Sequence, residues 1–235
     1  RDEELYFWSK NMKTFDQNNI NVIVSPLKTI EVCNDKLNFY KFFHGMNISV
    51  IKTSTKVEEL NKKFNYVVKE RYGSSSNNIG INLGKKDVIR HSQNLKHPIF
   101  QPYIKGQEIS IDAWYNNKYK LIGFHSRKRE IIEHGESKVT TSYSNDSVNK
   151  KIKKFLSKLQ FRGPIVVQAI VSKNKVSFIE CNARFGGAST ASISAGLDIF
   201  YWTISEFLFP NNNLIKFTPI KNKIKQVRIQ KDILI

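Results

Sequence analysis

The chain has 235 residues, of which 40% are hydrophobic and 12% aromatic, and its formal net charge is +18. This composition supports a buried core in one large domain or two subdomains, and no apolar run is long enough to predict a membrane span. The positive charge is scattered, and no helix-turn-helix, zinc-finger or RNA-recognition pattern accompanies it, so we expect no nucleic-acid partner.

The first half of the chain predicts a mixture of helices and short strands. An amphipathic helix is expected at 35–47, capped by Asn34 or Asp35, because its apolar residues form a wide face. The other elements expected here are a helix at 2–17, strands at 21–25 and 49–53, a helix at 56–64, a strand at 65–70, a Gly/Ser/Asn loop at 71–80 and a strand at 81–85.

The second half predicts more strands, several of them in hairpins. The expected elements are two strands flanking Gly106 within 99–115, a helix at 148–160, a hairpin at 164–182 that turns near Asn174, a helix at 198–208 and strands within 225–235. Helices and strands alternate irregularly along the chain. This order favours an α+β fold over a regular doubly wound sheet.

One predicted strand carries polar side chains at alternate positions. Glu180, Asn182 and Arg184 should share one face, and Phe178 should lie on the same face, because strand side chains alternate. Carboxylate and amide oxygens suit Mg²⁺, and an arginine beside them can stabilise a transferring phosphoryl group. The alternative is a surface strand with a salt bridge, but the glycines after Arg184 favour close approach of a phosphate.

The hairpin loop decides whether the preceding strand adds a ligand. A three-residue loop, Lys173 to Lys175, would place Gln168 opposite Glu180 and on the same face. A two-residue loop would turn Gln168 to the other face. We predict the three-residue loop.

Five segments resemble, in order, motifs of the ATP-grasp superfamily, most closely its carbamoyl-phosphate-synthase-like branch. They are NDKLNFYKFF (34–43), YVVKERYGSSS (66–76), FQPYIKGQEISIDAW (100–114), RGPIVVQAIV (162–171) and IECNARFGG (179–187). The resemblance extends through nearly all of the chain. It implies an α+β fold in which two subdomains hold ATP between them.

Matched position by position, the resemblance implies a set of ATP contacts. The residues are Lys36, Lys69, Arg71, Gly73, Ser74, Ser75, Ser76, Gln101, Pro102, Tyr103, Ile104 and Glu108. The lysines would contact the phosphates as point charges, and the loop at 73–76 would close over the β- and γ-phosphates. Backbone groups of 101–104 would bind the adenine edge, and the glutamate would hold the ribose hydroxyls.

The resemblance also implies the remaining site residues. Gln168, Glu180 and Asn182 would hold Mg²⁺, or Mn²⁺ in its place, and Arg184 and Lys69 would be catalytic. Further groups on the acceptor or phosphate side are expected from Arg127 or Arg129 and from the segment 135–137.

The expected activity is that of an ADP-forming ligase, which phosphorylates a carboxylate to an acyl phosphate and couples it to an amine or similar nucleophile. Phosphorylation of bicarbonate or carbamate, as in carbamoyl phosphate synthesis, and a non-catalytic ATP-binding subunit are the alternatives. The expected partners are small-molecule carboxylates and amines, with no membrane. Cys33 and Cys181 lack metal-ligand spacing and predict free thiols in a reducing cytoplasm.

The sequence departs from the family pattern in three respects. The phosphate loop has Ser75 and Asn78 where glycines are usual, and the first metal position, Gln168, is neutral. Third, only the tail of a Rossmann-like N-terminal domain is expected at 1–30, before a small subdomain at 31–100 and a large one at 101–235. A homodimer, or a partner subunit that supplies the N-terminal domain, is consistent with this division.

Overall fold

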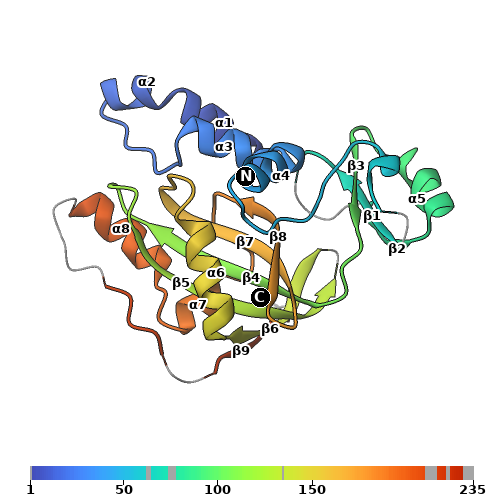
Figure 1. Ribbon diagram of the computed structural model, residues 1–235. Helices are drawn as coiled ribbons and strands as arrows, with labels where there is room; N and C mark the ends of the chain where they lie inside the picture. Colours follow the sequence, from blue (N-terminus) through green and yellow to red (C-terminus); the bar gives the residue numbers. More distant parts are fainter. Residues whose placement is uncertain are drawn as a thin grey trace, which may run out of the picture.

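The computed structural model has the predicted α+β fold, with two antiparallel sheets of six and three strands (Figure 1). The residues it describes are 2–61, 65–73, 78–133, 135–209, 216–220 and 223–229. Within them no helix combines the length and the apolar character that crossing a membrane requires.

The large sheet forms the centre of the molecule, with strand order β8-β7-β4-β5-β6-β9. Its strands are β4 (Gln107–Tyr115), β5 (Leu121–Glu133), β6 (Glu136–Tyr143), β7 (Gly163–Ser172), β8 (Lys175–Asn182) and β9 (Lys225–Val227). The helices around it are α1 (Asp2–Lys10), α2 (Met12–Gln17), α3 (Leu27–Asn34), α4 (Lys36–Gly45), α6 (Asp146–Leu156), α7 (Thr190–Ser194) and α8 (Ile199–Leu208). The predicted hairpin is formed by β7 and β8, and the predicted helices at 35–47 and 198–208 are α4 and α8.

The main core lies between one face of the large sheet and helices α3, α4 and α6. Helix α6 buries residues at helical spacing, including Val148, Ile152 and Phe155, and Asn145 caps it by accepting from the amide of Val148. The ring of Phe155 stacks 4.4 Å from Phe43 of α4 and 4.2 Å from Phe178 of β8. Each such buried aromatic side chain contributes about 1.5–3 kcal/mol to stability, so this stack ties both helices to the sheet.

The small sheet forms a separate lobe beside the large sheet (Figure 1). Its elements are β1 (Tyr66–Glu70), β2 (Gly80–Leu83), β3 (Pro98–Pro102), the short 3₁₀ helix η1 (Val57–Glu59) and α5 (Lys85–Ser92). Val68, Val88 and Phe100 belong to its own apolar cluster. Because β3 runs into β4 through residues 103–106, the chain passes directly from the small sheet to the large one.

Several expected elements differ in the structure. The helix expected at 2–17 is divided at Asn11, and of the helix expected at 56–64 only η1 forms within the described residues. The strands expected at 21–25 and 49–53 do not form, because neither segment has a strand to pair with beyond the single bridge of Val50 to Phe178. Of the C-terminal strands, β9 is present, whereas 230–235 lie outside the described residues.

Candidate functional site

The β7–β8 hairpin positions the predicted oxygen ligands, but not by the predicted turn. Ser172 pairs with Lys175, so the loop has two residues and the three-residue prediction is wrong. Gln168 nevertheless lies opposite Glu180, as predicted, because a register shift leaves Ile179 as an extra residue in β8. A β-bulge of this kind re-aims the side chains that follow it.

The bulge also separates Phe178 from the polar face. We expected Phe178 on the same face as Glu180, but it is buried in the main core together with Cys181. Both cysteines are buried free thiols. Beyond the bulge, Glu180 and Asn182 point away from this core and line two cavities on the other side.

The first of these, which we call the lysine cavity, has a volume of about 190 Å³. It is lined by Asp2, Glu3, Cys33, Asn34, Lys36, Tyr72, Gly73, Glu180 and Asn182. The ammonium group of Lys36 donates to the carbonyl oxygen of Gly73 at 2.7 Å, and Lys69 Nζ lies 3.6 Å from Glu180 Oε2. Three residues predicted to contact ATP or its metal, from α4, β1 and β8, are therefore together.

Both lysines are almost fully buried; Lys69 pairs with Glu180, and Lys36 lies near the carboxylates of Glu180, Asp2 and Asp35. Burial lowers the pKa of Lys36 below its ordinary value, although Glu180 opposes this effect. Burial alone would raise the pKa of Glu180, but the charges of Lys69 and Lys36 and a hydrogen bond from Asn182 bring it below its ordinary range. Lys36, Lys69 and Glu180 therefore form one buried group of interacting charges.

Helix α4 holds Lys36 at its first position. Asp35 caps the helix by accepting from the amides of Leu37 and Asn38, as one of the two predicted cap residues. The same carboxylate binds Arg71 through Nε at 2.8 Å and Nη2 at 2.6 Å. Arg71, predicted to contact ATP, therefore joins β1 to the start of α4 in this structure.

The second cavity, which we call the arginine cavity, has a volume of about 270 Å³. It is lined by Ser110, Arg127, Arg129, Gly135, Glu136, Ser137, Val166, Gln168, Glu180, Asn182, Arg184, Gly186, Gly187, Ala188 and Arg228. All three predicted metal ligands, both expected arginines and the whole segment 135–137 meet here. Among the residues that the structure describes, only Glu180 and Asn182 line both cavities, so these two residues stand between them.

Arg184 is held by a residue that the sequence did not indicate. Asp2, in the first turn of α1, accepts from Nε and Nη2 of Arg184, each at 2.6 Å, in a bidentate pair. Nη1 of Arg184 also donates to the carbonyl oxygen of Phe185. No local pattern marks Asp2, since 182 residues separate the partners.

A buried network holds Arg127 and the turn that follows Arg184. Arg127 Nε donates to Asp112 Oδ2 at 2.8 Å, and both side chains are almost inaccessible. The hydroxyls of Ser189 and Ser192 donate to the same carboxylate, and the amide of Gly186 donates to Ser189. Burial would raise the pKa of Asp112, but Arg127 and the hydroxyl donors lower it below its ordinary value.

Two further residues were missed in the sequence. Asp112 is a charged residue within the apolar run of β4, and a buried carboxylate needs partners, so this position could have been recognised from the sequence. Arg228, after β9, lines the arginine cavity and lies 3.2 Å from Glu136. Its neighbours in sequence are exposed or half-buried, so no burial pattern marks it.

The residues predicted to bind the adenine and the ribose line neither cavity, although Glu108 contacts Arg129 of the arginine cavity. Gln101 is buried and donates to Thr53, the amide of Tyr103 donates to the carbonyl oxygen of Asn65, and Glu108 pairs with Arg129. Pro102 ends β3, and Ile104 lies on the connection from β3 to β4. Ser74, Ser75 and Ser76 of the predicted phosphate loop lie outside the described residues, whereas Gly73 before them has φ +81°.

Oxygen ligands gather at the site, but few of them are charged. Among the described residues no group of three or more His, Cys, Asp or Glu side chains gathers to hold a metal ion. Gln168, Glu180 and Asn182 supply one carboxylate and two amides. This set fits Mg²⁺ only with phosphate oxygens in the shell, which is the usual arrangement at nucleotide sites.

The chain belongs to the ATP-grasp family, since the model of the ATP-grasp domain matches residues 33–188. Among solved structures, it resembles the biotin carboxylase domain of Hydrogenobacter thermophilus 2-oxoglutarate carboxylase, in complex with MgADP, ADP and bicarbonate. The TM-score is 0.76 at 15% identity, over 95% of this chain and 55% of that one.

A ligase and a synthetase show the same fold. L-amino acid ligase from Bacillus licheniformis has a TM-score of 0.66 at 18% identity, over 89% of this chain and 55% of that one. N5-carboxyaminoimidazole ribonucleotide synthetase from Thermus thermophilus has a TM-score of 0.63 at 13% identity, over 81% of this chain and 55% of that one. The chain thus spans about half the length of these proteins, and at such identities the likeness shows the fold.

Proposed function

We propose that the protein is an ADP-forming ligase, which uses ATP to phosphorylate a carboxylate and couples the acyl phosphate to an amine or similar nucleophile. The observation that carries this proposal is the position of Glu180 and Asn182, which line both the lysine cavity and the arginine cavity. One cavity suits terminal phosphates and the other suits a carboxylate. The two oxygen-bearing side chains lie where those groups would meet.

In this proposal the lysine cavity receives the phosphates of ATP. The ammonium groups of Lys36 and Lys69 are desolvated, so their attraction for a phosphate is stronger than at a surface. Gly73 begins the loop that would close over the phosphates, and its positive φ is typical of backbone that approaches an anion. The adenine and ribose contacts of 101–104 and Glu108 remain predictions.

The reaction would proceed in two displacements. A carboxylate oxygen of the first substrate attacks the γ-phosphorus, the bond from that phosphorus to the β–γ bridging oxygen breaks, and ADP leaves. The amine then attacks the acyl carbon, inorganic phosphate leaves and the amine loses a proton. Lys69 and Arg184 would stabilise the charge on the phosphoryl oxygens, which is how guanidinium and ammonium groups accelerate phosphoryl transfer.

Gln168, Glu180 and Asn182 would hold Mg²⁺, or Mn²⁺, together with phosphate oxygens. When bound, the ion would neutralise charge on the β- and γ-phosphates. The side chains themselves contribute fixed positions, because β7 and β8 are paired and the bulge at Ile179 aims the two β8 ligands away from the core.

Bicarbonate is the second candidate for the phosphoryl acceptor. The arginine cavity, at about 270 Å³, is below the usual size of a ligand pocket, and the biotin carboxylase neighbour was crystallised with bicarbonate and MgADP. The division of the chain into three parts, its oligomeric state and its subunit partners also remain predictions.

The test is ATP turnover with defined substrate pools. The protein is incubated with ATP, MgCl₂ and pools of carboxylic acids with amines, or with bicarbonate alone, and ADP, AMP and phosphate are measured. We expect ADP and phosphate only when an acceptor is present. Glu180→Ala and Arg184→Ala should each lower turnover by about 10²–10³-fold, the loss typical of one transition-state contact, with an unchanged circular dichroism spectrum.

Matched controls remove the same charges elsewhere. Glu133→Ala and Arg90→Ala change exposed residues and should retain full turnover. Formation of AMP and pyrophosphate would contradict the acyl-phosphate route. ATP binding without turnover in every pool would instead support a non-catalytic ATP-binding protein.

A further inference from the structure

A large cavity lies away from the candidate site. It has a volume of about 1310 Å³ and shares no lining residue with the lysine or arginine cavity. We call it the β5 groove. It is lined by Leu121, Ile122, Gly123, Phe124, His125, Ser126, Lys128, Ser142, Tyr143, Ser144, Asp146, Asn149, Lys150, Lys153, Phe217, Pro219, Ile220 and Lys223.

The groove follows a strand edge beside which the described residues place no further strand. β5 has 13 residues and β6 only 8, and their pairing begins at Ser126 opposite Tyr143. After Tyr143 the chain turns into α6, so among the described residues Leu121–His125 pair with β4 alone. Such an edge presents free backbone donors and acceptors over about 16 Å, at about 3.3 Å per residue, and is a template for a further strand.

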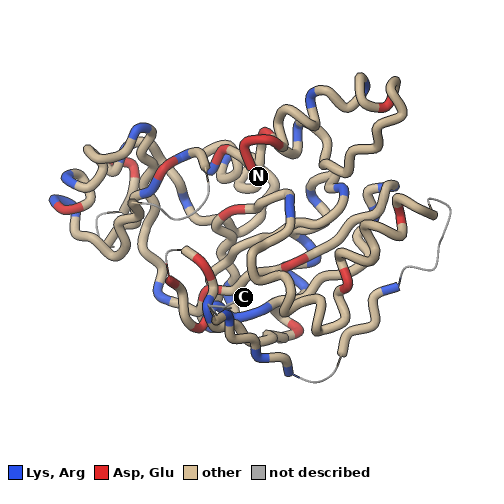
Figure 2. The backbone as a smooth tube through the Cα atoms, turned by 180° about the vertical axis from the view of Figure 1, so that it is seen from behind, with Lys and Arg blue, Asp and Glu red and all other residues tan. Residues whose placement is uncertain are grey.

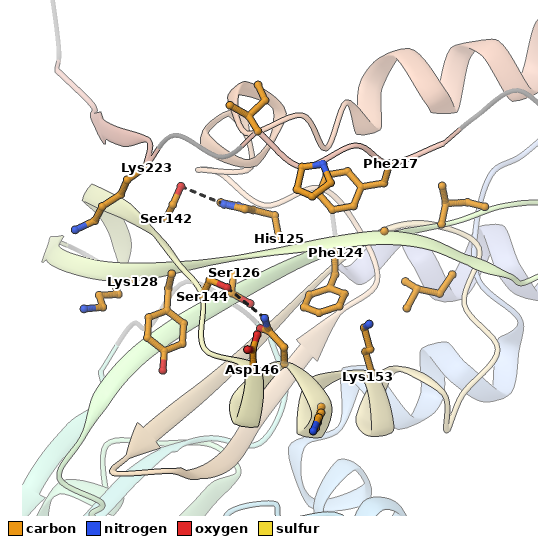
Figure 3. Close-up of a pocket in the computed structure, with 18 residues that line it drawn as sticks. Phe124, His125, Ser126, Lys128, Ser142, Ser144, Asp146, Lys153, Phe217 and Lys223 are labelled. Atoms are coloured by element: carbon orange, nitrogen blue, oxygen red, sulfur yellow. Dashed lines mark hydrogen bonds between the residues drawn. The ribbon is translucent and has the colours of Figure 1, made fainter.

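Two walls flank this edge, one on each face of the sheet (Figure 3). Phe124, Asp146 and Lys153 lie on the side of α6. Phe217 and Lys223 lie on the opposite side, where Phe217 covers Gly123. An incoming strand would direct alternate side chains to the two walls, and the volume exceeds the roughly 300–1,000 Å³ of pockets for small ligands.

The charges around the groove select an acidic occupant. Four lysines line it, namely Lys128, Lys150, Lys153 and Lys223, against the single carboxylate of Asp146. Lysine and arginine are distributed over most of the chain (Figure 2), and the net charge of +18 would repel a second copy. An acidic chain is attracted both over a distance and at the groove.

One buried hydroxyl in the groove also lacks a partner. Ser126 is 3% exposed, and its Oγ has no hydrogen-bond partner among the described residues. His125 cannot serve as one, since its two ring nitrogens contact the hydroxyls of Ser192 and Ser142. A buried hydroxyl without a partner costs about 1–3 kcal/mol, and an acceptor from an added chain would remove this cost.

We propose that the β5 groove binds an extended, acidic segment of a partner protein, which joins the large sheet as a strand beside Leu121–His125. This site is independent of the proposed ligase activity, because none of its residues lines the two cavities of the candidate site.

The probe is a short dye-labelled peptide that alternates valine with glutamate, compared with one that alternates valine with lysine. Fluorescence anisotropy gives the affinity, and hydrogen exchange gives the protected amides. We expect the acidic peptide to bind and to protect those amides of Leu121–His125 that do not already donate to β4. The amides of 128–133 should be unchanged, since β6 already pairs with this part of β5.

The matched variants lie on the same helix. Lys150→Glu with Lys153→Glu reverses two groove charges, whereas Lys151→Glu with Lys154→Glu reverses two exposed charges outside it. The first pair should weaken peptide binding by about tenfold or more, equivalent to about 1.4 kcal/mol, and the control pair by much less. ATP binding should be unchanged in both.

Four results would overturn the proposal. They are equal binding of the basic peptide, equal effects of the two variant pairs, no protection of Leu121–His125 at saturating peptide, and displacement of the peptide by pyrophosphate or benzoate alone. The last would assign the groove to a small anion. If the variant Lys150→Glu with Lys153→Glu fails to fold, the proposal is tested by hydrogen exchange of the unmodified protein with and without the acidic peptide.

Discussion

Asp112→Asn tests whether the buried network stabilises the fold around the arginine cavity. The substitution keeps the size of the side chain but removes the charge that neutralises Arg127. Asp112 is 0% exposed and Arg127 3%, so the guanidinium would be left buried without its counter-ion. Breaking a buried pair in this way costs about 3–5 kcal/mol. Because Ser189 and Ser192 also lose a charged acceptor, we expect the upper part of that range.

This loss should be visible in equilibrium unfolding. For a chain of this length about 1 kcal/mol lowers the Tm by about 2–4 °C, so a loss of about 4–5 kcal/mol predicts a fall of about 8–20 °C by calorimetry. Urea denaturation at neutral pH gives the free energy directly. The double variant Asp112→Asn with Arg127→Met should recover part of it, because no guanidinium remains unpaired.

The pH dependence provides an independent check. The folded pKa of Asp112 lies below its ordinary value of 3.8, so its stabilisation is complete above that value and is lost as pH falls through the folded pKa. The difference between unmodified protein and Asp112→Asn should therefore shrink only in strong acid. A loss below about 1 kcal/mol at neutral pH, the size of an exposed pair, would refute this account of the network.

Three other changes should have distinct effects. Asp2→Asn should lower kcat with little change in the KM for ATP, because Arg184 loses its orienting carboxylate, and Asp2→Glu should restore part of the rate in the same assay. Gly196→Ala should cost about 1–3 kcal/mol in urea denaturation, since its φ is +94° and a Cβ would lie 2.7 Å from a backbone oxygen; Gly45→Ala, with open space, is the control. Because burial lowers the pKa of Lys36, ATP affinity measured by titration should decline at a less alkaline pH than in Lys36→Arg; identical pH profiles would contradict this.

The sequence predicted best where a local pattern carries the information. The apolar face and cap of α4 and the hairpin of β7 and β8 each arise within a few residues, and each lies where the pattern indicated. The order of the five family motifs then indicated the fold. The roles of the individual site residues remain predictions.

The missed features depend on contacts between distant residues. β5 and β6 were not expected, because Arg127 and Arg129 do not resemble core residues until Asp112 and Glu108 on β4 neutralise them. Asp2 is recognisable only once α1 lies beside Arg184. The bulge at Ile179 could not be predicted either, since the sequence does not show at which position one strand of an antiparallel pair has an extra residue.

The shorter turn and the extra residue in β8 cancel each other between Ser172 and Glu180. The bulge at Ile179 therefore lies between the tip of the β7–β8 hairpin and the predicted ligands Gln168 and Glu180. Lys173 and Asn174 at the tip of the hairpin are exposed. A spectroscopic label attached there would report motion of the hairpin while leaving the pairing of Gln168 with Glu180 unchanged.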